Sequence, residues 1–264
     1  MGRVPPPGGH TPPCSADDRT ARYRAGMAHE IEGGMVEVDG LRAYLSRPTD
    51  PSTAGMLLLP MVTGIGAQVR EFADDLARTG VTALSWDPWH GPSTDDTSRE
   101  RLFELMGRLD DEECLAEMRR LLDHMHSELG LSRVGVVGFC MGGRFALLLG
   151  ARDERLANVV AYHPTVPGTP APNHTVDAVE ATARITAPVL MLYPGADSLV
   201  PWESFTRLQS ALHSRETGES LVHVYPRAEH GFTDRARRES SEVNAAAYDL
   251  SWPQVTRFIA TTTA

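Results

Sequence analysis

Short apolar runs alternate with amphipathic segments along most of the chain. The apolar runs have the length of strands and are largely continuous, which is typical of strands covered on both faces in a parallel sheet. They predict strands at residues 56–60, 81–86, 133–138, 158–162, 188–193 and 221–225. The segments between them repeat their apolar positions with helical spacing, as Val69, Phe72 and Leu76 do. They predict helices at residues 68–79, 110–129, 202–212 and 241–259 and one that begins at residue 142.

The order of these elements predicts the fold class. Residues 34–38 and 41–45 flank an Asp-Gly dipeptide, which favours the tight turn of a β-hairpin. Strands and helices then alternate. This alternation indicates an α/β protein with a mostly parallel central sheet that is flanked by helices on both faces.

The most informative segment lies between a predicted strand and a predicted helix and reads Gly-Phe-Cys-Met-Gly over residues 138–142. A strand, a tight turn flanked by glycines and a helix make a nucleophile elbow, whose central residue stands clear of the sheet in a strained conformation. Small neighbours tolerate the turn, and the helix N-terminus stabilises negative charge. The sequence therefore predicts Cys140 as a thiol nucleophile.

A thiol nucleophile needs a base, and the base needs an acceptor that orients it. In a site of this type, the chain order is nucleophile, acid, histidine. Asp197 and His230 each follow one of the last two predicted strands, in that order. All three residues thus fall at carboxyl ends of strands, where ligands bind in parallel sheets. We predict Cys140 as nucleophile, His230 as base and Asp197 as the acid that orients it.

Structural interpretations compete with these roles. A lone cysteine is often a small apolar core residue, which is our interpretation of Cys14 and Cys114 because no glycines surround them. Asp197 could instead cap the helix predicted from residue 202. Other histidines also follow strands, and we expect His90 and His163 to line the pocket rather than to act as the base.

Two backbone N–H groups are needed to hold the oxyanion of acyl transfer. Met141 follows the nucleophile, and Val62 is our candidate in the loop after the early strand. Two proline-containing segments, residues 87–97 and 165–173, also follow strands and are expected over the same edge. Several side chains are predicted to line the pocket, and for each the alternative is a structural position in the core or at the rim. They are Met61, Trp86, Trp89, His90, Tyr162, His163, Trp202, Phe232 and Arg235.

Composition and charge limit the classes of partner that the protein is expected to bind. The 264 residues are 41% hydrophobic and 23% charged, which suits a domain with an ample core, and a net charge of −10 argues against nucleic acid and anionic membranes. Three cysteines give no disulfide framework, and no apolar run is long enough to span a bilayer, so we expect a cytoplasmic protein. Residues 1–30 lack an apolar core, so we expect a flexible leader at 1–30 and a single domain at 31–264.

With these motifs, the sequence resembles the dienelactone hydrolase family from about Leu41 to the C-terminus. The resemblance is carried by Gly-Phe-Cys-Met-Gly-Gly at 138–143, Pro-Gly-Ala-Asp at 194–197 and Glu-His-Gly-Phe at 229–232. It implies an α/β-hydrolase fold. It also implies an enzyme that opens lactones or cleaves esters through a thioester acyl-enzyme and needs no metal or cofactor.

The resemblance also assigns roles to individual residues. It implies Cys140 as nucleophile, His230 as base and Asp197 as its orienting acid. It implies Val62 and Met141 as the backbone donors to the oxyanion. The expected partner is a small ester or lactone, and the expected assembly is a monomer or a small homo-oligomer.

Two departures from the family pattern concern activation and substrate. The best-studied members carry a glutamate immediately before the first oxyanion donor, where this chain has Met61. The dienelactone enzymes of the family grip the substrate carboxylate with two arginines, whose positions fall near Gly91 and Asp234 here. Arg235 is one residue away and is the candidate replacement. A dienelactone carboxylate is therefore expected to be poorly held.

These features favour a cysteine-dependent hydrolase of small esters or lactones. Two alternatives stay open at this point. The same scaffold could transfer an acyl group, cyclise or rearrange its substrate. The chain could also be a binding protein whose site has decayed.

Overall fold

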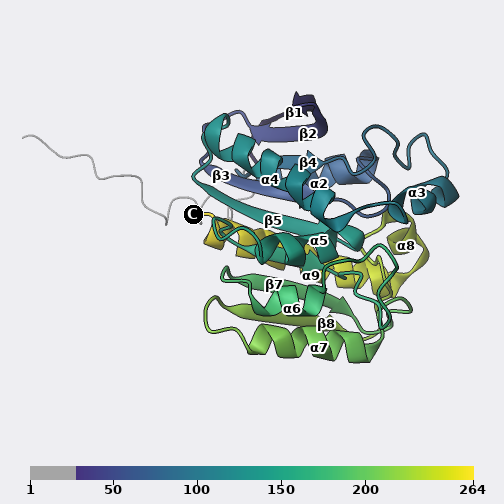
Figure 1. Ribbon diagram of the computed structural model, residues 1–264. Coiled ribbons are helices and arrows are strands. Elements are labelled where there is room, and N and C mark those ends of the chain that lie inside the picture. The colour runs from purple at the N-terminus through teal and green to yellow at the C-terminus, as the bar shows by residue number, and fades with distance from the viewer. Residues whose placement is uncertain (1–27) are drawn as a thin grey trace, which may run out of the picture.

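The computed structural model describes residues 28–264, and its centre is a single mixed sheet. The strands of this described part are β1 Ile31–Val38, β2 Leu41–Pro48, β3 Ala54–Leu59, β4 Thr82–Trp86, β5 Arg133–Phe139, β6 Val159–Tyr162, β7 Val189–Pro194 and β8 Ser220–Tyr225. Their order across the sheet is β1-β2-β4-β3-β5-β6-β7-β8 (Figure 1). The β1–β2 hairpin and the β2–β4 pair are antiparallel, and the pairs from β4 to β8 are parallel.

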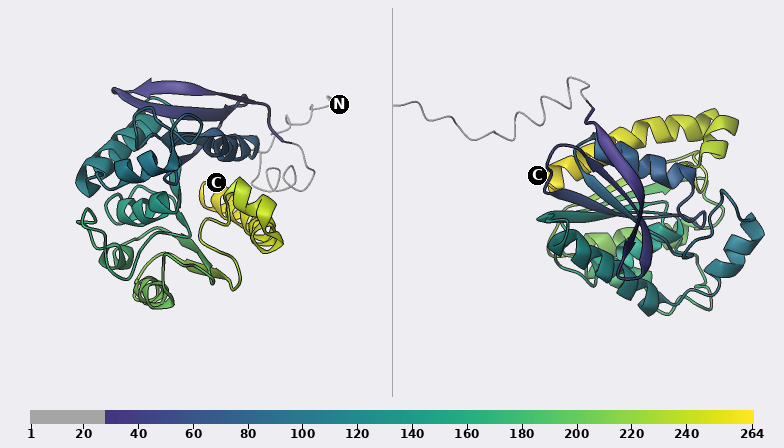
Figure 2. Two further views of the ribbon diagram at one scale, coloured as in Figure 1. Left: turned by 90° about the vertical axis from the view of Figure 1, so that its right-hand side faces the viewer. Right: turned by 90° about the horizontal axis from the view of Figure 1, so that it is seen from above.

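Helices cover both faces of this sheet. They are α2 Ala67–Arg78, α3 Arg99–Met106, α4 Asp111–Ser127, α5 Met141–Gly150, α6 Ala178–Ala183, α7 Trp202–His213, α8 Arg235–Ser240 and α9 Glu242–Thr262. Four of them, α4 to α7, pack against one face, and α2 and α9 pack against the other (Figure 2). This arrangement confirms the predicted α/β class, with a mostly parallel sheet between two helical layers.

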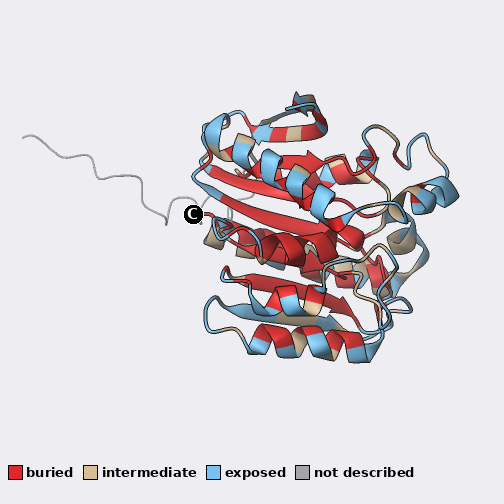
Figure 3. Ribbon diagram, viewed as in Figure 1, coloured by how far each residue is buried: buried red, intermediate tan, exposed pale blue. Residues whose placement is uncertain are grey.

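Most of the apolar runs in the sequence are buried strands of the sheet, and the exception is the run in β8 at the sheet edge, which has no buried residue. Every residue of β3, β4, β6 and β7 is buried, as the red central arrows in Figure 3 show. On the α2–α9 face, the ring of Phe139 stacks with those of Phe72 and Tyr162, with centroid distances of 4.7 and 5.1 Å. These rings contribute packing beyond the burial of their area. Continuous hydrophobicity, rather than alternation, is what a sheet covered on both faces requires.

The predicted strands and helices are all present, but three short helices were missed. Helix α3 buries only Leu102, and α8 buries no residue at all. Helix α8 therefore lacks the apolar stripe from which a helix is predicted, whereas α3 places Leu105 and Met106 beside Leu102 but has only eight residues. The third, α6, has only six residues. Within residues 28–264, no helix combines the length and the apolar character that crossing a membrane requires.

The division into a leader and one domain stays a prediction. Residues 1–27 of the expected leader lie outside the described residues. The first strand begins at Ile31, where we expected the domain to begin.

Candidate active site

Cys140 sits in the sharp turn between β5 and α5. Its backbone has φ 54° and ψ −114°, a conformation that a residue with a side chain rarely adopts. The turn is this tight because its neighbours have no side chains. A Cβ on Gly138 would lie 2.0 Å from the carbonyl oxygen of Gly142, and one on Gly142 would lie 2.2 Å from that of Leu59. The glycines are therefore a steric requirement of the turn that presents the sulfur.

Three side chains meet at the carboxyl ends of β5, β7 and β8. The Nε2 atom of His230 lies 3.1 Å from the sulfur of Cys140. The Nδ1 atom of the same ring lies 2.7 Å from Oδ2 of Asp197. Thiol, imidazole and carboxylate are thus connected in the order that nucleophilic catalysis with a base and an orienting acid requires.

Asp197 uses its two carboxylate oxygens for different partners. Oδ1 accepts hydrogen bonds from the backbone N–H groups of Leu199, at 2.8 Å, and Val200, at 2.9 Å. Oδ2 faces the ring of His230. The N-cap of α7 is Pro201, so Asp197 orders the turn before this helix and does not cap the helix itself. The turn in return fixes the carboxylate that contacts the imidazole.

Thr165 is a partner of the thiol that the sequence did not single out. It lies in the segment after β6, and its Oγ1 is 3.1 Å from the Cys140 sulfur and 3.5 Å from Nε2 of His230. Its backbone N–H donates to the Cys140 carbonyl at 3.0 Å. The sequence predicted that this proline-rich segment follows a strand at the carboxyl edge, but a single threonine in it carries no recognisable pattern.

The thiol and the imidazole each favour the charged form of the other. Burial alone would lower the pKa of His230, but hydrogen bonds to Asp197 and Cys140 raise this pKa to about 10. Burial alone would raise the pKa of the Cys140 thiol, but the hydrogen bonds from His230 and Thr165 hold it below its usual value. The geometry therefore favours a thiolate–imidazolium pair at neutral pH.

The two candidate oxyanion donors differ in what surrounds them. Met141 is the first residue of α5, and its backbone N–H helps to lower the pKa of the Cys140 thiol. In the described part of the chain, the backbone N–H of Val62 has no hydrogen-bond partner. Met61 is buried, and its sulfur lies 4.0 Å from the hydroxyl of Thr233. An unpartnered N–H is free to bind a substrate oxygen.

Of the predicted pocket residues, Trp86, Trp89 and His90 lie at the end of β4. The indole of Trp86 is buried and donates to Glu117 at 2.8 Å, while the exposed His90 ring lies 3.2 Å from the same carboxylate. The indole of Trp89 donates to the carbonyl of Val62 at 3.0 Å. Trp89 is thus placed against the loop of the candidate oxyanion donor.

Three further predicted residues lie in the interior around His230. Tyr162, His163 and Phe232 are fully buried. The ring of His163 packs edge-on against His230 with centroids 5.0 Å apart, and its Nε2 lies 3.0 Å from the Thr233 hydroxyl. Burial holds the pKa of His163 well below its usual value, so this ring is neutral. It places an uncharged ring against His230.

The last two predicted residues lie at the surface. Trp202, at the start of α7, is 53% exposed and packs edge-on against Tyr193. The guanidinium of Arg235 pairs with Glu71 in a surface groove of about 410 Å³. All the lining residues of this groove, among them Tyr248, belong to α2, α8 and α9. The guanidinium of Arg235 therefore lies on the face of the sheet that α2 and α9 cover, where Glu71 already neutralises its charge.

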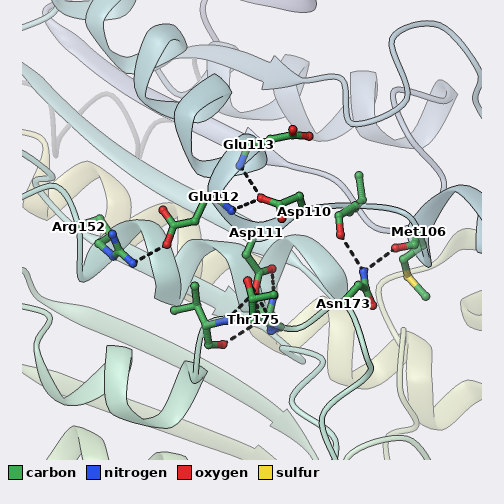
Figure 4. Close-up of polar contacts among 11 residues, drawn as sticks. Met106, Asp110, Asp111, Glu112, Glu113, Arg152, Asn173 and Thr175 are labelled. Carbon is green, nitrogen blue, oxygen red and sulfur yellow. Dashed lines mark hydrogen bonds and ion pairs between the residues drawn. The ribbon is translucent and has the colours of Figure 1, made fainter.

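A buried ion pair anchors the far end of the segment that carries Thr165. Arg144 of α5 makes a bidentate contact with Asp111 of α4 at 2.6 and 2.8 Å, and both side chains are buried. The same carboxylate accepts the backbone N–H groups of Thr175 and Val176, both at 2.9 Å (Figure 4). One carboxylate thus ties α4, α5 and this segment together. Among residues 28–264, no group of three or more His, Cys, Asp or Glu side chains is arranged to hold a metal ion.

Comparison with known proteins agrees with this fold and with the resemblance seen in the sequence. A family model described as the dienelactone hydrolase family matches residues 41–263. The carboxymethylenebutenolidase of Rhodococcus opacus is 29% identical over 220 residues, which are 81% of this chain and 84% of that protein.

Two solved structures show the same fold. One, named a putative dienelactone hydrolase of Klebsiella pneumoniae, has a TM-score of 0.72 at 24% identity and covers 85% of this chain and 98% of its own. The other is the dienelactone hydrolase-like promiscuous phosphotriesterase P91 from metagenomic libraries. It has a TM-score of 0.67 at 20% identity, and the match covers 89% of this chain and 99% of the P91 chain. At these identities, the likeness concerns the fold alone.

Proposed function

Because the chain belongs to the dienelactone hydrolase family, we propose that it hydrolyses small neutral esters or lactones with Cys140 as its nucleophile. The observation that carries this proposal is the contact of His230 with both Cys140, at 3.1 Å, and Asp197, at 2.7 Å. The chain is a hydrolase of the lactone and ester type by family. The residue roles and the thioester intermediate are our proposal.

The reaction begins with the thiolate of Cys140 beside the imidazolium of His230. The sulfur attacks the substrate carbonyl carbon, and the backbone N–H groups of Val62 and Met141 hold the oxygen as it becomes negative. The tetrahedral species collapses when His230 gives its proton to the leaving oxygen, which leaves a thioester on the sulfur. Asp197 keeps the ring oriented throughout by its contact with Nδ1.

Hydrolysis of the thioester completes the cycle. The neutral His230 takes a proton from a water molecule, and the resulting hydroxide attacks the thioester carbonyl. The same two N–H groups hold the second oxyanion. Collapse breaks the carbon–sulfur bond, releases the acid and restores the thiolate of Cys140 beside the imidazolium.

The preference for neutral substrates follows from the ion pairs that Arg235 and Arg237 already make. Arg235 pairs with Glu71, and Arg237 lies 3.5 Å from Glu229. A substrate carboxylate would have to compete with these acidic side chains for its cation. The relative from Rhodococcus opacus has a name that describes a carboxylate-bearing lactone. We therefore carry the reaction over from the family and propose a different substrate charge.

The decisive experiment compares the wild type with Cys140→Ala on p-nitrophenyl acetate and p-nitrophenyl butyrate. We expect the variant to lose at least about a thousandfold in kcat/KM, since it lacks the atom that forms the acyl-enzyme. The matched control is Cys114→Ala, because this second thiol is buried in the core and burial raises its pKa to about 12. Turnover that survives in Cys140→Ala would reject the proposal. Chromatographic detection of the free acid distinguishes hydrolysis from acyl transfer or cyclisation.

A further inference from the structure

The hydroxyl of Thr165 lies as close to the Cys140 sulfur as the ring of His230 does. Its Oγ1 lies 3.1 Å from the Cys140 sulfur. We propose that Thr165 is a further catalytic residue, whose hydroxyl donates a hydrogen bond to the Cys140 thiolate and holds it in the resting enzyme. This inference rests on the proposed role of Cys140 as nucleophile.

The direction of the hydrogen bond follows from the neighbouring groups. The Thr165 oxygen also lies 3.5 Å from Nε2 of His230. In the ion-pair state Nε2 carries a proton that it donates to the sulfur, so it has no lone pair to offer the hydroxyl. The thiolate is then the acceptor for both donors, and hydrogen bonds to a charged acceptor are stronger than neutral ones. Thr165 keeps its own proton, and no bond to it is made or broken.

The position of the hydroxyl is built into the turn. The Thr165 backbone N–H donates to the carbonyl of Cys140, so this residue is tied to the turn that it serves. At the other end of its segment, Asn173 donates to the carbonyls of Met106 and Leu109 at 3.0 and 3.1 Å, and Asp111 holds the next turn (Figure 4). The segment is therefore fixed at both ends, and the hydroxyl loses little conformational freedom by making its contact.

Met61, in the loop after β3, supplies no comparable group. Met61 is buried, and its thioether lies beside the hydroxyl of Thr233. A thioether has no proton to donate and is only a weak acceptor. Among the side chains of residues 28–264, the hydrogen bonds to the sulfur therefore come from His230 and Thr165.

The titratable groups that surround the sulfur make the effect measurable. They are His230, Asp197 on the far side of its ring, and the neutral His163 packed against it. His163 is already uncharged at neutral pH because it is buried. A change in the ionisation of Cys140 after removal of the Thr165 hydroxyl therefore reports on the contact between these two residues.

The test measures alkylation of Cys140 by iodoacetamide as a function of pH, with the modified peptide identified by mass spectrometry. In Thr165→Val, which keeps the shape but not the hydroxyl, we expect the midpoint of the alkylation profile to rise by about one pH unit. Thr165→Ser keeps the hydroxyl and should give the wild-type midpoint. The matched control is Thr206→Val, which removes a hydroxyl of α7 that bonds to the Glu203 carbonyl instead.

Two results would overturn the inference. One is a Thr165→Val profile that superimposes on the wild type. The other is a Thr165→Ser midpoint that moves as far as that of Thr165→Val, since the methyl group rather than the hydroxyl would then matter. If Thr165→Val does not fold, Thr165→Ala is measured in its place under the same criteria. Alkylation needs no ester, so this outcome is independent of the Cys140→Ala turnover assay that tests the proposed function.

Discussion

Gly142 packs directly against the backbone of Leu59, so closely that a Cβ on Gly142 would lie 2.2 Å from the Leu59 carbonyl oxygen. Real Cβ atoms do not approach backbone oxygens to this distance, and neither partner is the end of a flexible side chain. The contact joins the first turn of α5 to β3 beside the turn that carries Cys140. It therefore couples the stability of the fold to the geometry of the site.

We expect Gly142→Ala to separate α5 from β3 and to disturb the turn around Cys140. The variant should lose about 3 kcal/mol or more of unfolding free energy, or fail to accumulate in soluble form. Urea unfolding followed by circular dichroism measures the change. The control is Gly34→Ala in β1, where a Cβ would meet nothing within 4 Å. Equal stability losses in the two variants would contradict the steric explanation.

The ion pair between Arg144 and Asp111 gives a second prediction, on stability. We expect Arg144→Ala to lose about 3–5 kcal/mol of unfolding free energy, because the buried carboxylate then has no charged partner. Arg152→Ala breaks the exposed pair with Glu112 and should lose less than about 1 kcal/mol. Denaturant unfolding of both variants provides the measurement. A loss below 1 kcal/mol in Arg144→Ala would show that this pair does not anchor the segment.

The third prediction concerns pH. Hydrogen bonds to Asp197 and Cys140 raise the pKa of His230 to about 10, so the ring keeps its proton up to that pH and loses it above. The enzyme then lacks both the partner of the thiolate and the acid for the leaving group, so kcat/KM should fall above about pH 10.

The variant Asp197→Asn tests the cause of this limb. Without the carboxylate, the His230 pKa drops, so the alkaline limb should move to lower pH. The turnover should fall by about 10²–10⁴-fold, because the ring is no longer oriented. The measurement is the pH dependence of turnover of p-nitrophenyl acetate by the wild type and Asp197→Asn, in the pre-steady state and the steady state. The range from about pH 5 to about pH 11 covers the reference pKa values of His and Cys. An unmoved alkaline limb in Asp197→Asn would assign that limb to another group.

Residues at the ends of apolar strands were the ones that the sequence could indicate. Cys140 and Asp197 each follow a buried strand, and His230 follows β8, an apolar strand at the sheet edge with no buried residue. Parallel strands bring such ends to one edge of the sheet. Thr165 also follows a strand. Its contact with the sulfur, however, depends on the path of a proline-rich segment whose anchors, Arg144 and Asp111, belong to other elements. Long-range contacts of this kind leave no periodicity in the chain.

The surface helix α8 is a second feature that the sequence could not predict. Arg235 stands one position from where the family places a cation, but α8 begins there and turns the side chain toward Glu71. This helix buries no residue, so no apolar pattern predicts it. The roles of the predicted pocket residues therefore stay predictions, whereas the fold class is confirmed.

The fourth prediction, on the charge of the substrate, separates this chain from a carboxylate-binding relative. Because Arg235 and Arg237 already face carboxylates, we expect p-nitrophenyl hexanoate to be hydrolysed with at least about tenfold higher kcat/KM than the p-nitrophenyl monoester of adipic acid, which has the same chain length and one negative charge. Asp234→Arg adds a cation at the start of α8 and should lower the ratio of kcat/KM for the neutral ester to kcat/KM for the charged ester. Asp234→Asn removes the negative charge without adding a positive one and should lower this ratio less. Equal turnover of the two esters by the wild type would mean that a cation is available to the substrate after all, and a carboxylate-bearing lactone would then be the better candidate.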